Sequence, residues 1–226
     1  IINIKETVRG LLTARRVAAA IAEKGEYVLF VGTKRQARPI VREQAERCGM
    51  PYVAERWPGG LLTNYVTIRS RLERLEELEE LERTGNIEDY SKKMVSSLRR
   101  EQRKIERNLG GVREMDELPG LLIIVDPARE DIAVREAVKL EIPTIGWIDT
   151  NGDPEDLDVV VPANDDSIGA IRIFARLMAD AVLEGLERSE IAPPAAERAP
   201  SPPQQSEPPE TAEEPEEEPP SEEEQD

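Results

Sequence analysis

Short apolar runs alternate with helical patterns along most of the chain. The runs of strand length lie at 1–4, 27–31, 52–54, 121–125, 144–148 and 159–161. The runs YVLFV and LLIIV are continuously apolar, which is typical of strands covered on both faces. Apolar residues at helical spacing fill most of the intervening segments, at 8–25, 35–49, 132–140 and 168–186. This alternation predicts a parallel sheet with helices on both faces, and we expect a flavodoxin-like three-layer α/β/α sandwich.

The segment 64–110 interrupts this alternation, because it contains no strand pattern. Its apolar residues form two narrow rows at helical spacing, with Glu, Arg and Lys on their flanks: Ile68, Leu72, Leu75, Leu78 and Leu81, then Met94, Leu98, Ile105 and Leu109. A turn at 84–86 separates the two rows. The pattern predicts an inserted antiparallel α-helical hairpin, packed as a coiled coil and projecting about 30 Å. An ordinary pair of surface helices is the alternative.

The chain therefore divides into four predicted segments. Residues 1–63 and 111–190 form the two parts of an α/β domain, 64–110 form the hairpin, and 191–226 form a tail. The tail holds ten of the 18 prolines and 12 acidic residues against the single basic Arg198. It has too few apolar side chains to offset the entropy of ordering, so we expect disorder and a solubilising role. A specific docking role is the alternative. Because the chain opens inside an apolar run without Met, we also expect a missing N-terminal segment.

The charge of the chain is unevenly placed. The whole sequence has a net charge of −17, but residues 1–190 carry 29 basic and 35 acidic residues, a net of −6. Residues 1–60 have a net charge of +5, residues 61–120 of −1, and residues 121–190 of −10. A polyanionic partner is therefore expected to meet the first half of the body, and the acidic last third to face solvent or protein.

Composition removes several classes of function. The chain has no histidine, which excludes Ser-His-Asp and Cys-His catalysis and most zinc sites within it. Its single cysteine, Cys48, excludes internal disulfides and is expected to be a buried packing residue in a reducing, cytoplasmic compartment. No run approaches the ~20 apolar residues that span a bilayer, and no signal peptide is visible. We therefore expect no membrane contact.

The loops after the predicted strands are the expected functional edge of a doubly wound sheet. In GTKRQ, at 32–36, the amides of a helix start together with Lys34 and Arg35 could attract a phosphate of a nucleotide or of RNA. Neither common phosphate-binding glycine motif occurs anywhere in the chain, and a solvated turn is the alternative. Asp126 and Asp149 each end a strand and could hold Mg²⁺, although turn formation and helix capping explain them more simply.

The stretch ERWPGGLLTN, at 55–64, holds the second candidate loop. Arg56 and Trp57 offer a bidentate phosphate donor beside a stacking face, a combination that suits RNA. Gly59 and Gly60 permit positive φ or close approach of another backbone, and Thr63 or Asn64 can cap the first hairpin helix. The alternative is a tryptophan that fills the core on a tight turn.

Six stretches in a fixed order make the chain resemble a known family. They are LFVGTKRQA, ERWPGGLLTN, NLGGV after the hairpin, LPGLLIIVDPARE, IPTIGWIDTNGDP and VPANDDSIGAI. Together they are similar to the bacterial-type ribosomal protein S2 family of the small subunit, over essentially 1–188. The resemblance implies a flavodoxin-like sheet with an inserted α-hairpin and no enzymatic activity. It also implies contact with small-subunit ribosomal RNA and neighbouring ribosomal proteins, including docking of the large multi-OB-domain protein that captures messenger RNA.

The resemblance also selects candidate residues. By position, it places Lys34, Arg35, Arg56, Trp57, Gly59, Gly60, Thr63 and Asn64 in the motif loops of the family. Asn151, Asp153, Asn164 and Asp165 correspond to further loops that shape the surface or face a partner. From the sequence itself, the hairpin adds cations expected to follow RNA phosphates: Arg99, Arg100, Arg103, Lys104 and Arg107. A solvated helix face is the alternative for this cluster.

Both lines of inference favour a non-catalytic protein that binds ribosomal RNA, without cofactor or metal. Two alternatives stay open at this point. One is a doubly wound enzyme that binds a nucleotide or sugar phosphate at the strand ends. The other is a free adaptor that uses the hairpin as a protein-binding arm.

Overall fold

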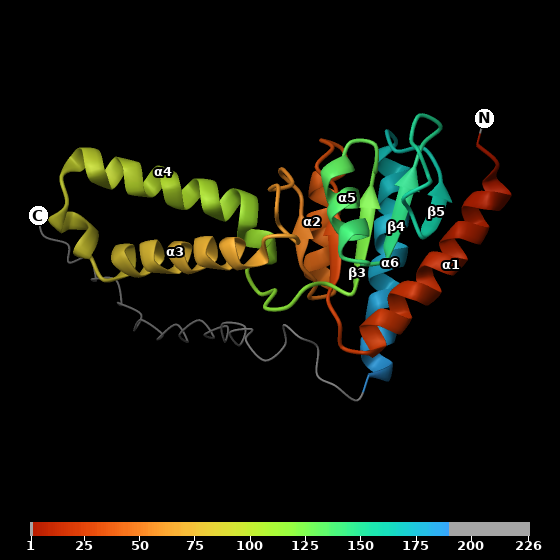
Figure 1. The fold of residues 1–226 in the computed structure, drawn as a ribbon, viewed down its shortest axis with the longest axis horizontal. Helices are drawn as coiled ribbons and strands as arrows, with labels where there is room; N and C mark the ends of the chain where they lie inside the picture. The colour runs from red at the N-terminus through yellow and green to blue at the C-terminus, as the bar shows by residue number, and fades with distance from the viewer. Residues whose placement is uncertain (1, 190–226) are drawn as a thin grey trace, which may run out of the picture.

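The computed structural model describes residues 2–189 of the chain, apart from the side chains of residues 88 and 89 (Figure 1). Five strands form one sheet: β1 (Val28–Val31), β2 (Tyr52–Val53), β3 (Leu121–Val125), β4 (Thr144–Ile148) and β5 (Val159–Pro162). All neighbouring strands are parallel, in the order β2-β1-β3-β4-β5. Strands β1, β3 and β4 are buried along their whole length. The predicted flavodoxin-like sheet is confirmed.

Helices cover both faces of this sheet. Helices α1 (Ile4–Glu23), α2 (Arg38–Arg47) and α6 (Ile168–Arg188) pack together on one face, and α5 (Asp131–Lys139) lies on the other (Figure 1). Right-handed crossovers require this division, because the chain leaves β1 and β3 in opposite directions across the sheet. Within residues 2–189, none of the helices combines the length and the apolar character that crossing a bilayer requires.

The strand predicted at 1–4 is wrong. Residue 1 lies outside the described residues, and α1 already begins at Ile4. The Asn3 side chain accepts a hydrogen bond from the backbone amide of Lys5 (3.1 Å) and caps the helix. Within the apolar pattern at 8–25, Val8 and Leu12 have exposed fractions of 49% and 51%. Small alanines occupy the buried face instead, so α1 packs closely against α6.

Helix α6 begins at the predicted residue, and Ser167 caps it: its hydroxyl accepts a hydrogen bond from the amide of Ala170 (3.4 Å). Asp165 and Asp166 precede the cap but do not serve as one. The two aspartates are engaged elsewhere, with Lys34.

Two helices occupy the segment predicted for the hairpin. Helix α3 (Tyr65–Arg83) and helix α4 (Lys92–Leu109) project side by side from the sheet domain (Figure 1). A short 3-10 turn, η1 (Asn86–Asp89), joins them, and a second, η2 (Gly110–Val112), returns the chain to the sheet. The apolar row of α3 is buried from Ile68 to Leu78, whereas Leu98 and Ile105 of α4 are only partly buried. Coiled-coil packing of the pair, and the division of the chain into domains, stay predictions.

The base of the hairpin is fixed against the edge strand β2. A Cβ atom on Gly111 would lie 2.4 Å from the carbonyl oxygen of Tyr52, so this close approach requires glycine. Arg113 forms a bidentate ion pair with Glu79 of α3, at 2.7 and 3.0 Å. These contacts attach the hairpin to the sheet domain and cover the exposed edge of the sheet.

Candidate nucleic-acid interface

Lys34 lies at the strand ends, where a doubly wound enzyme would bind its ligand. Its Nζ atom is 2.8 Å from Asp165 Oδ1, 2.6 Å from Asp166 Oδ1 and 3.5 Å from Asp126 Oδ2. Its side chain is only 16% exposed, and that of Asp165 is 5% exposed. The loops after β1, β3 and β5 therefore meet through one ammonium group, which closes this part of the strand-end edge.

The surroundings of Lys34 hold it in the charged form. Burial acts to lower the pKa of Lys34, but hydrogen bonds with Asp165 and Asp166 outweigh burial and raise the pKa above its ordinary value. The charge is compensated inside the protein, so the phosphate contact expected of Lys34 does not fit this geometry. Among the side chains that the structure describes, there is also no group of three or more acidic or cysteine residues placed to hold a metal ion. The cation held by Asp126, Asp165 and Asp166 is the lysine.

Trp57 is buried in the core, with an exposed fraction of 6%. Its indole Nε1 donates a hydrogen bond to Glu136 Oε1 of α5 at 3.1 Å. An RNA base cannot stack on a ring in this position, so the structure contradicts the stacking role expected for Trp57. Gly60 has a φ of 84°, which favours glycine, whereas Gly59 shows neither a positive φ nor a close contact. The tight turn therefore serves to place the tryptophan in the core.

Glu136 organises the whole loop after β2. Its two carboxylate oxygens accept hydrogen bonds from the indole of Trp57, the amides of Gly60, Leu62 and Thr63, and the hydroxyl of Thr63, at 2.7–3.2 Å. Burial acts to raise the pKa of this carboxyl, but these hydrogen bonds prevail and lower it below its ordinary value. Sequence reasoning missed Glu136, because a single glutamate within the α5 pattern gives no signal of its distant partners.

The remaining loop candidates mostly shape the backbone. The Asn164 carboxamide oxygen accepts hydrogen bonds from the amides of Asp166 and Ser167, and Asp153 accepts one from the amide of Glu155. Asn151 is exposed. Asn64 occupies the N-cap position of α3, but its side chain bonds to the hydroxyl of Thr67 rather than to a backbone amide.

Arg35 and Arg56 differ from their neighbours in these loops, because both side chains are exposed. Among the described residues, no ion pair involves either of them. Of the cations predicted at the strand ends, these two are free to meet an outside anion.

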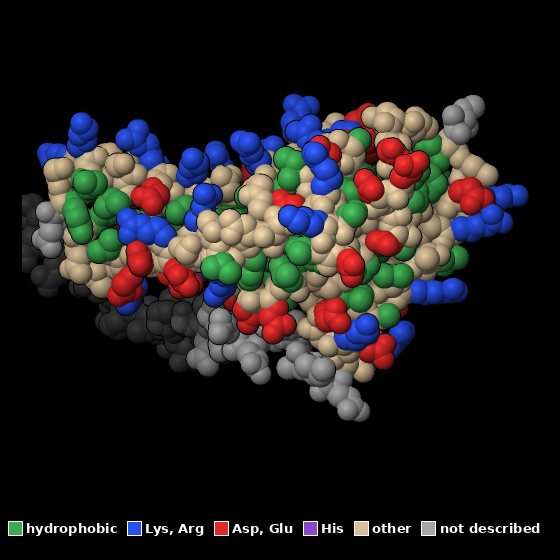
Figure 2. Space-filling model, viewed as in Figure 1, with side chains coloured by type: hydrophobic (Ala, Val, Ile, Leu, Met, Phe, Trp, Pro, Cys, Tyr) green, Lys and Arg blue, Asp and Glu red, His purple; other side chains and the backbone are tan. Residues whose placement is uncertain are grey.

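Helix α4 carries the densest group of free cations. Seven of its residues are basic, two are acidic, and all seven basic residues are exposed: Lys92, Lys93, Arg99, Arg100, Arg103, Lys104 and Arg107. At about 100° per residue they fall within an arc of about 140°, opposite the apolar row that faces α3. We call this arc the α4 basic face. Figure 2 shows Lys and Arg side chains along the outer edge of the hairpin.

Helix α3 balances little of this charge. It carries six glutamates and four arginines, but among the described side chains only Arg99 of the basic face forms an ion pair, with Glu82 at 3.0 Å. Arg100 and Arg103 each donate through Nε to a carbonyl oxygen of their own helix. Six of the seven charges are therefore available to a partner.

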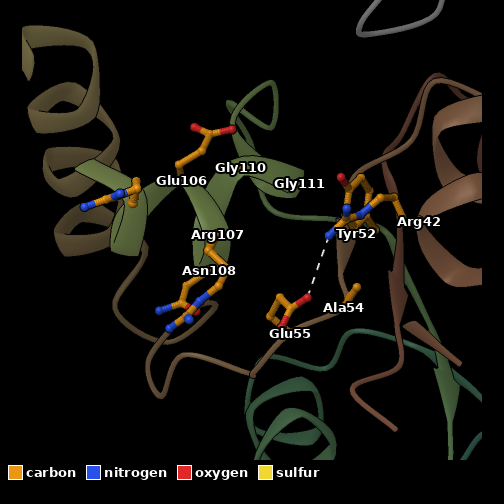
Figure 3. A pocket seen from close by; sticks show the side chains of 10 residues that line it. Arg42, Tyr52, Ala54, Glu55, Glu106, Arg107, Asn108, Gly110 and Gly111 are labelled. Atoms are coloured by element: carbon orange, nitrogen blue, oxygen red, sulfur yellow. Dashed lines mark ion pairs between the residues drawn. The ribbon is translucent and has the colours of Figure 1, made fainter. Parts of the chain in front are cut away.

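A cleft of about 370 Å³ lies where the hairpin meets the sheet domain. Figure 3 shows Arg42 and Tyr52 on one side and Arg107 and Asn108 on the other. The Arg42 guanidinium lies 5.9 Å from the centre of the Tyr52 ring and 3.8 Å from Glu55, which also pairs with Arg38 at 2.9 Å. The cleft thus continues the α4 basic face toward α2. Arg42 could not be selected from the sequence, because only the fold brings α2 beside the end of α4.

Comparisons with known proteins agree on one family. The family model described as ribosomal protein S2 matches residues 1–185. The small ribosomal subunit protein uS2 of Rhodopirellula baltica is 51% identical over 201 residues, covering 88% of this chain and 77% of that protein. The small ribosomal subunit protein uS2 of Geotalea uraniireducens is 46% identical over 185 residues, covering 82% of this chain and 72% of that protein.

Proposed function

Because this chain belongs to the ribosomal protein S2 family, whose role in the small ribosomal subunit is structural and not enzymatic, we propose that its hairpin binds small-subunit ribosomal RNA. The α4 basic face makes the main contact. The observation that supports this most directly is the set of exposed cations on one side of α4, six of which have no ion pair within the described chain. Lys34 closes part of the strand-end edge, and the hairpin carries exposed cations away from the sheet domain. This arrangement favours a structural RNA-binding role.

The contact is mainly with phosphates. Arginines at i, i+4 spacing, such as Arg99, Arg103 and Arg107, follow one another at about 6 Å along the helix axis and can each take a phosphate oxygen. Such contacts fix position and orientation and carry little sequence information. Arg35 and Arg56 at the strand ends add free cations on the sheet domain, and Arg42 in the cleft adds one that shares the Glu55 carboxylate with Arg38.

Removing charge from the α4 basic face should weaken RNA binding. We expect the triple variant R100Q/R103Q/R107Q to bind a small-subunit ribosomal RNA fragment about tenfold or more weakly at 0.1 M salt. The slope of log K against log salt should become shallower by about two to three, since each lost phosphate contact removes about 0.7 to 0.9. Filter binding at several salt concentrations measures both quantities.

The matched control is R172Q/R176Q/R188Q, which removes three exposed charges from α6 on the sheet domain. This variant should keep nearly all of the affinity and the slope. Equal losses in the two triple variants would mean that net charge matters and the α4 basic face does not. An α4 variant with full affinity would exclude the proposal.

Membership in the family extends the proposal to a protein neighbour, the multi-OB-domain protein of the small subunit. Residues 121–190 carry a net charge of −10, which disfavours RNA and leaves this part of the surface to a protein or to solvent. Small subunits assembled without this chain should retain less of the multi-OB-domain protein after sedimentation, and adding the chain back should restore it. Equal retention in both samples would contradict this contact.

A further inference from the structure

We propose that the acidic C-terminal segment of this chain docks on its own α4 basic face and competes there with nucleic acid. Ribosomal RNA then displaces the segment when the full set of contacts forms. The proposal rests on the RNA-binding role proposed above for α4, and it adds an internal competitor that makes that binding selective.

The α4 basic face lacks a counter-charge in the described chain. The helix carries a net charge of +5 over 18 residues. Arg99, Arg103 and Arg107 are spaced at i, i+4, as are Arg100 and Lys104, and like charges at this spacing repel one another on a helix. An anionic segment lying across these side chains would relieve that repulsion.

Residues 197–226 supply the complementary charge. They contain 12 acidic residues and the single basic residue Arg198. Five glutamates fall within six positions: Glu213, Glu214, Glu216, Glu217 and Glu218. Helix α3, with a net charge of −2, and residues 121–190, with a net of −10, would repel this segment. Residues 1–60 have a net charge of +5, the same as α4, but that charge is spread over 60 residues instead of 18. Charge complementarity therefore directs the segment to α4.

The length of the chain permits this contact. The last described helix ends at Arg188, and the glutamate cluster begins 25 residues later, a span of up to about 80 Å if extended. Helix α4, with 18 residues, is about 27 Å long. A tether of this length gives an effective concentration on the order of millimolar. A weak contact, screened by salt, is therefore enough to occupy the face in the free protein.

This competitor acts selectively. RNA that makes only a few phosphate contacts gains too little binding free energy to displace the tethered segment. Ribosomal RNA that also engages the cleft and the sheet domain makes contacts that the segment does not oppose. We therefore expect the segment to weaken the binding of arbitrary RNA, with little loss of affinity for ribosomal RNA that makes the full set of contacts.

A contact measurement without RNA tests docking directly. In the full chain, S221C carries a paramagnetic label, and NMR relaxation of backbone amides reports which residues approach it. Cys48 does not compete for the label, because it is buried, and burial raises the pKa of its thiol to about 12. We expect faster relaxation along α4 and not along α6, with loss of the effect at about 0.5 M salt.

A binding measurement tests competition. The full-length variant E213Q/E214Q/E216Q/E217Q/E218Q should bind polyuridylate about three- to tenfold more tightly than the natural sequence at 50 mM salt. The two proteins should become equal near 0.5 M salt. The control E23Q/E117Q/E155Q/D156N/E187Q removes five exposed charges from the body and should change affinity much less.

Each outcome separates the hypotheses. Unchanged α4 relaxation would overturn docking, and α4 relaxation with equal RNA affinity of the glutamine variant would overturn competition. A similar gain of affinity in the body control would show that net charge alone is responsible and would overturn the proposal too. If the label contacts α4 while R100Q/R103Q/R107Q retains full affinity for ribosomal RNA, the RNA-binding role of α4 fails and docking stands.

Discussion

We expect Glu136→Ala to lower the free energy of unfolding by about 4 kcal/mol at neutral pH. The substitution removes the acceptor of five hydrogen bonds that hold the loop after β2. An unsatisfied buried donor costs about 1–3 kcal/mol, and water can reach only the exposed part of this set. Thermal unfolding followed by circular dichroism should show a fall in Tm of about 8–16 °C.

Two further variants test whether the lost hydrogen bonds of Glu136 cause the fall in stability. Arg135→Ala changes the neighbouring, exposed position on α5 and should lower Tm only slightly. Glu136→Gln keeps one acceptor oxygen and should give an intermediate loss. Equal stability of Glu136→Ala and Arg135→Ala would show that the carboxylate does not hold the loop.

The dependence on pH gives an independent check of the same site. The pKa of Glu136 is lowered in the folded protein, so its stabilisation is present above its unfolded pKa of about 4.3. That stabilisation is lost as pH falls through the folded pKa. The stability difference between the natural protein and Glu136→Gln should therefore be constant near neutral pH and shrink below about pH 4.

The second large effect is expected from Lys34→Ala. The variant leaves Asp126 and the buried Asp165 without the ammonium group between them, and uncompensated buried charge costs about 3–5 kcal/mol. We expect a loss of about 3 kcal/mol at pH 7, because Lys34 keeps some exposure to water. The loss should diminish in acid, because burial raises the pKa of Asp165 above its ordinary value and protonation removes its unpaired charge. Urea unfolding at pH 7 and pH 4 measures the difference.

The adjacent Arg35 is the matched control for Lys34. Its side chain is exposed and forms no ion pair in the described part of the chain, so Arg35→Ala should leave stability nearly unchanged. For RNA affinity, the proposed function predicts the opposite pattern. Arg35→Ala should bind RNA more weakly, whereas Lys34→Ala, under conditions in which it is folded, should bind RNA about as well as the natural protein. A stable Lys34→Ala protein with weak RNA binding would return Lys34 to the phosphate-binding group.

Much of the fold could be predicted from local pattern. The strands at 121–125 and 144–148 appear at the predicted residues, because five-residue apolar runs are too short for a buried helix and fit strands covered on both faces. The two hairpin helices follow equally from their apolar rows. The run at 1–4 misled the prediction, since a capped helix start can begin with the same apolar letters as a strand.

The site could be predicted only in part. The family resemblance and the exposed cations of α4 are visible in the sequence, and the family match confirms the former. Which of the other candidates can contact RNA depends on burial, and the sequence does not show it. Trp57 lies in the core and Lys34 lies among carboxylates, although both residue types are also common in RNA-binding sites. Their partners Glu136 and Asp165 lie 79 and 131 positions away, beyond the reach of any local pattern.

The sequence by itself determined the sheet order, the presence of a long charged hairpin, the family and the polarity of charge along the chain. The sheet and the hairpin follow from apolar spacing together with the rules for parallel sheets, the distribution of charge follows from residue counts, and the family follows from the resemblance of six motif stretches. Only the tertiary structure decided which cations are free, because availability depends on the carboxylate or carbonyl that the fold brings beside each one. Lys34 forms ion pairs with aspartates inside the protein. Most cations of the α4 basic face point away from α3 and form no such pairs, so they are available to an external polyanion.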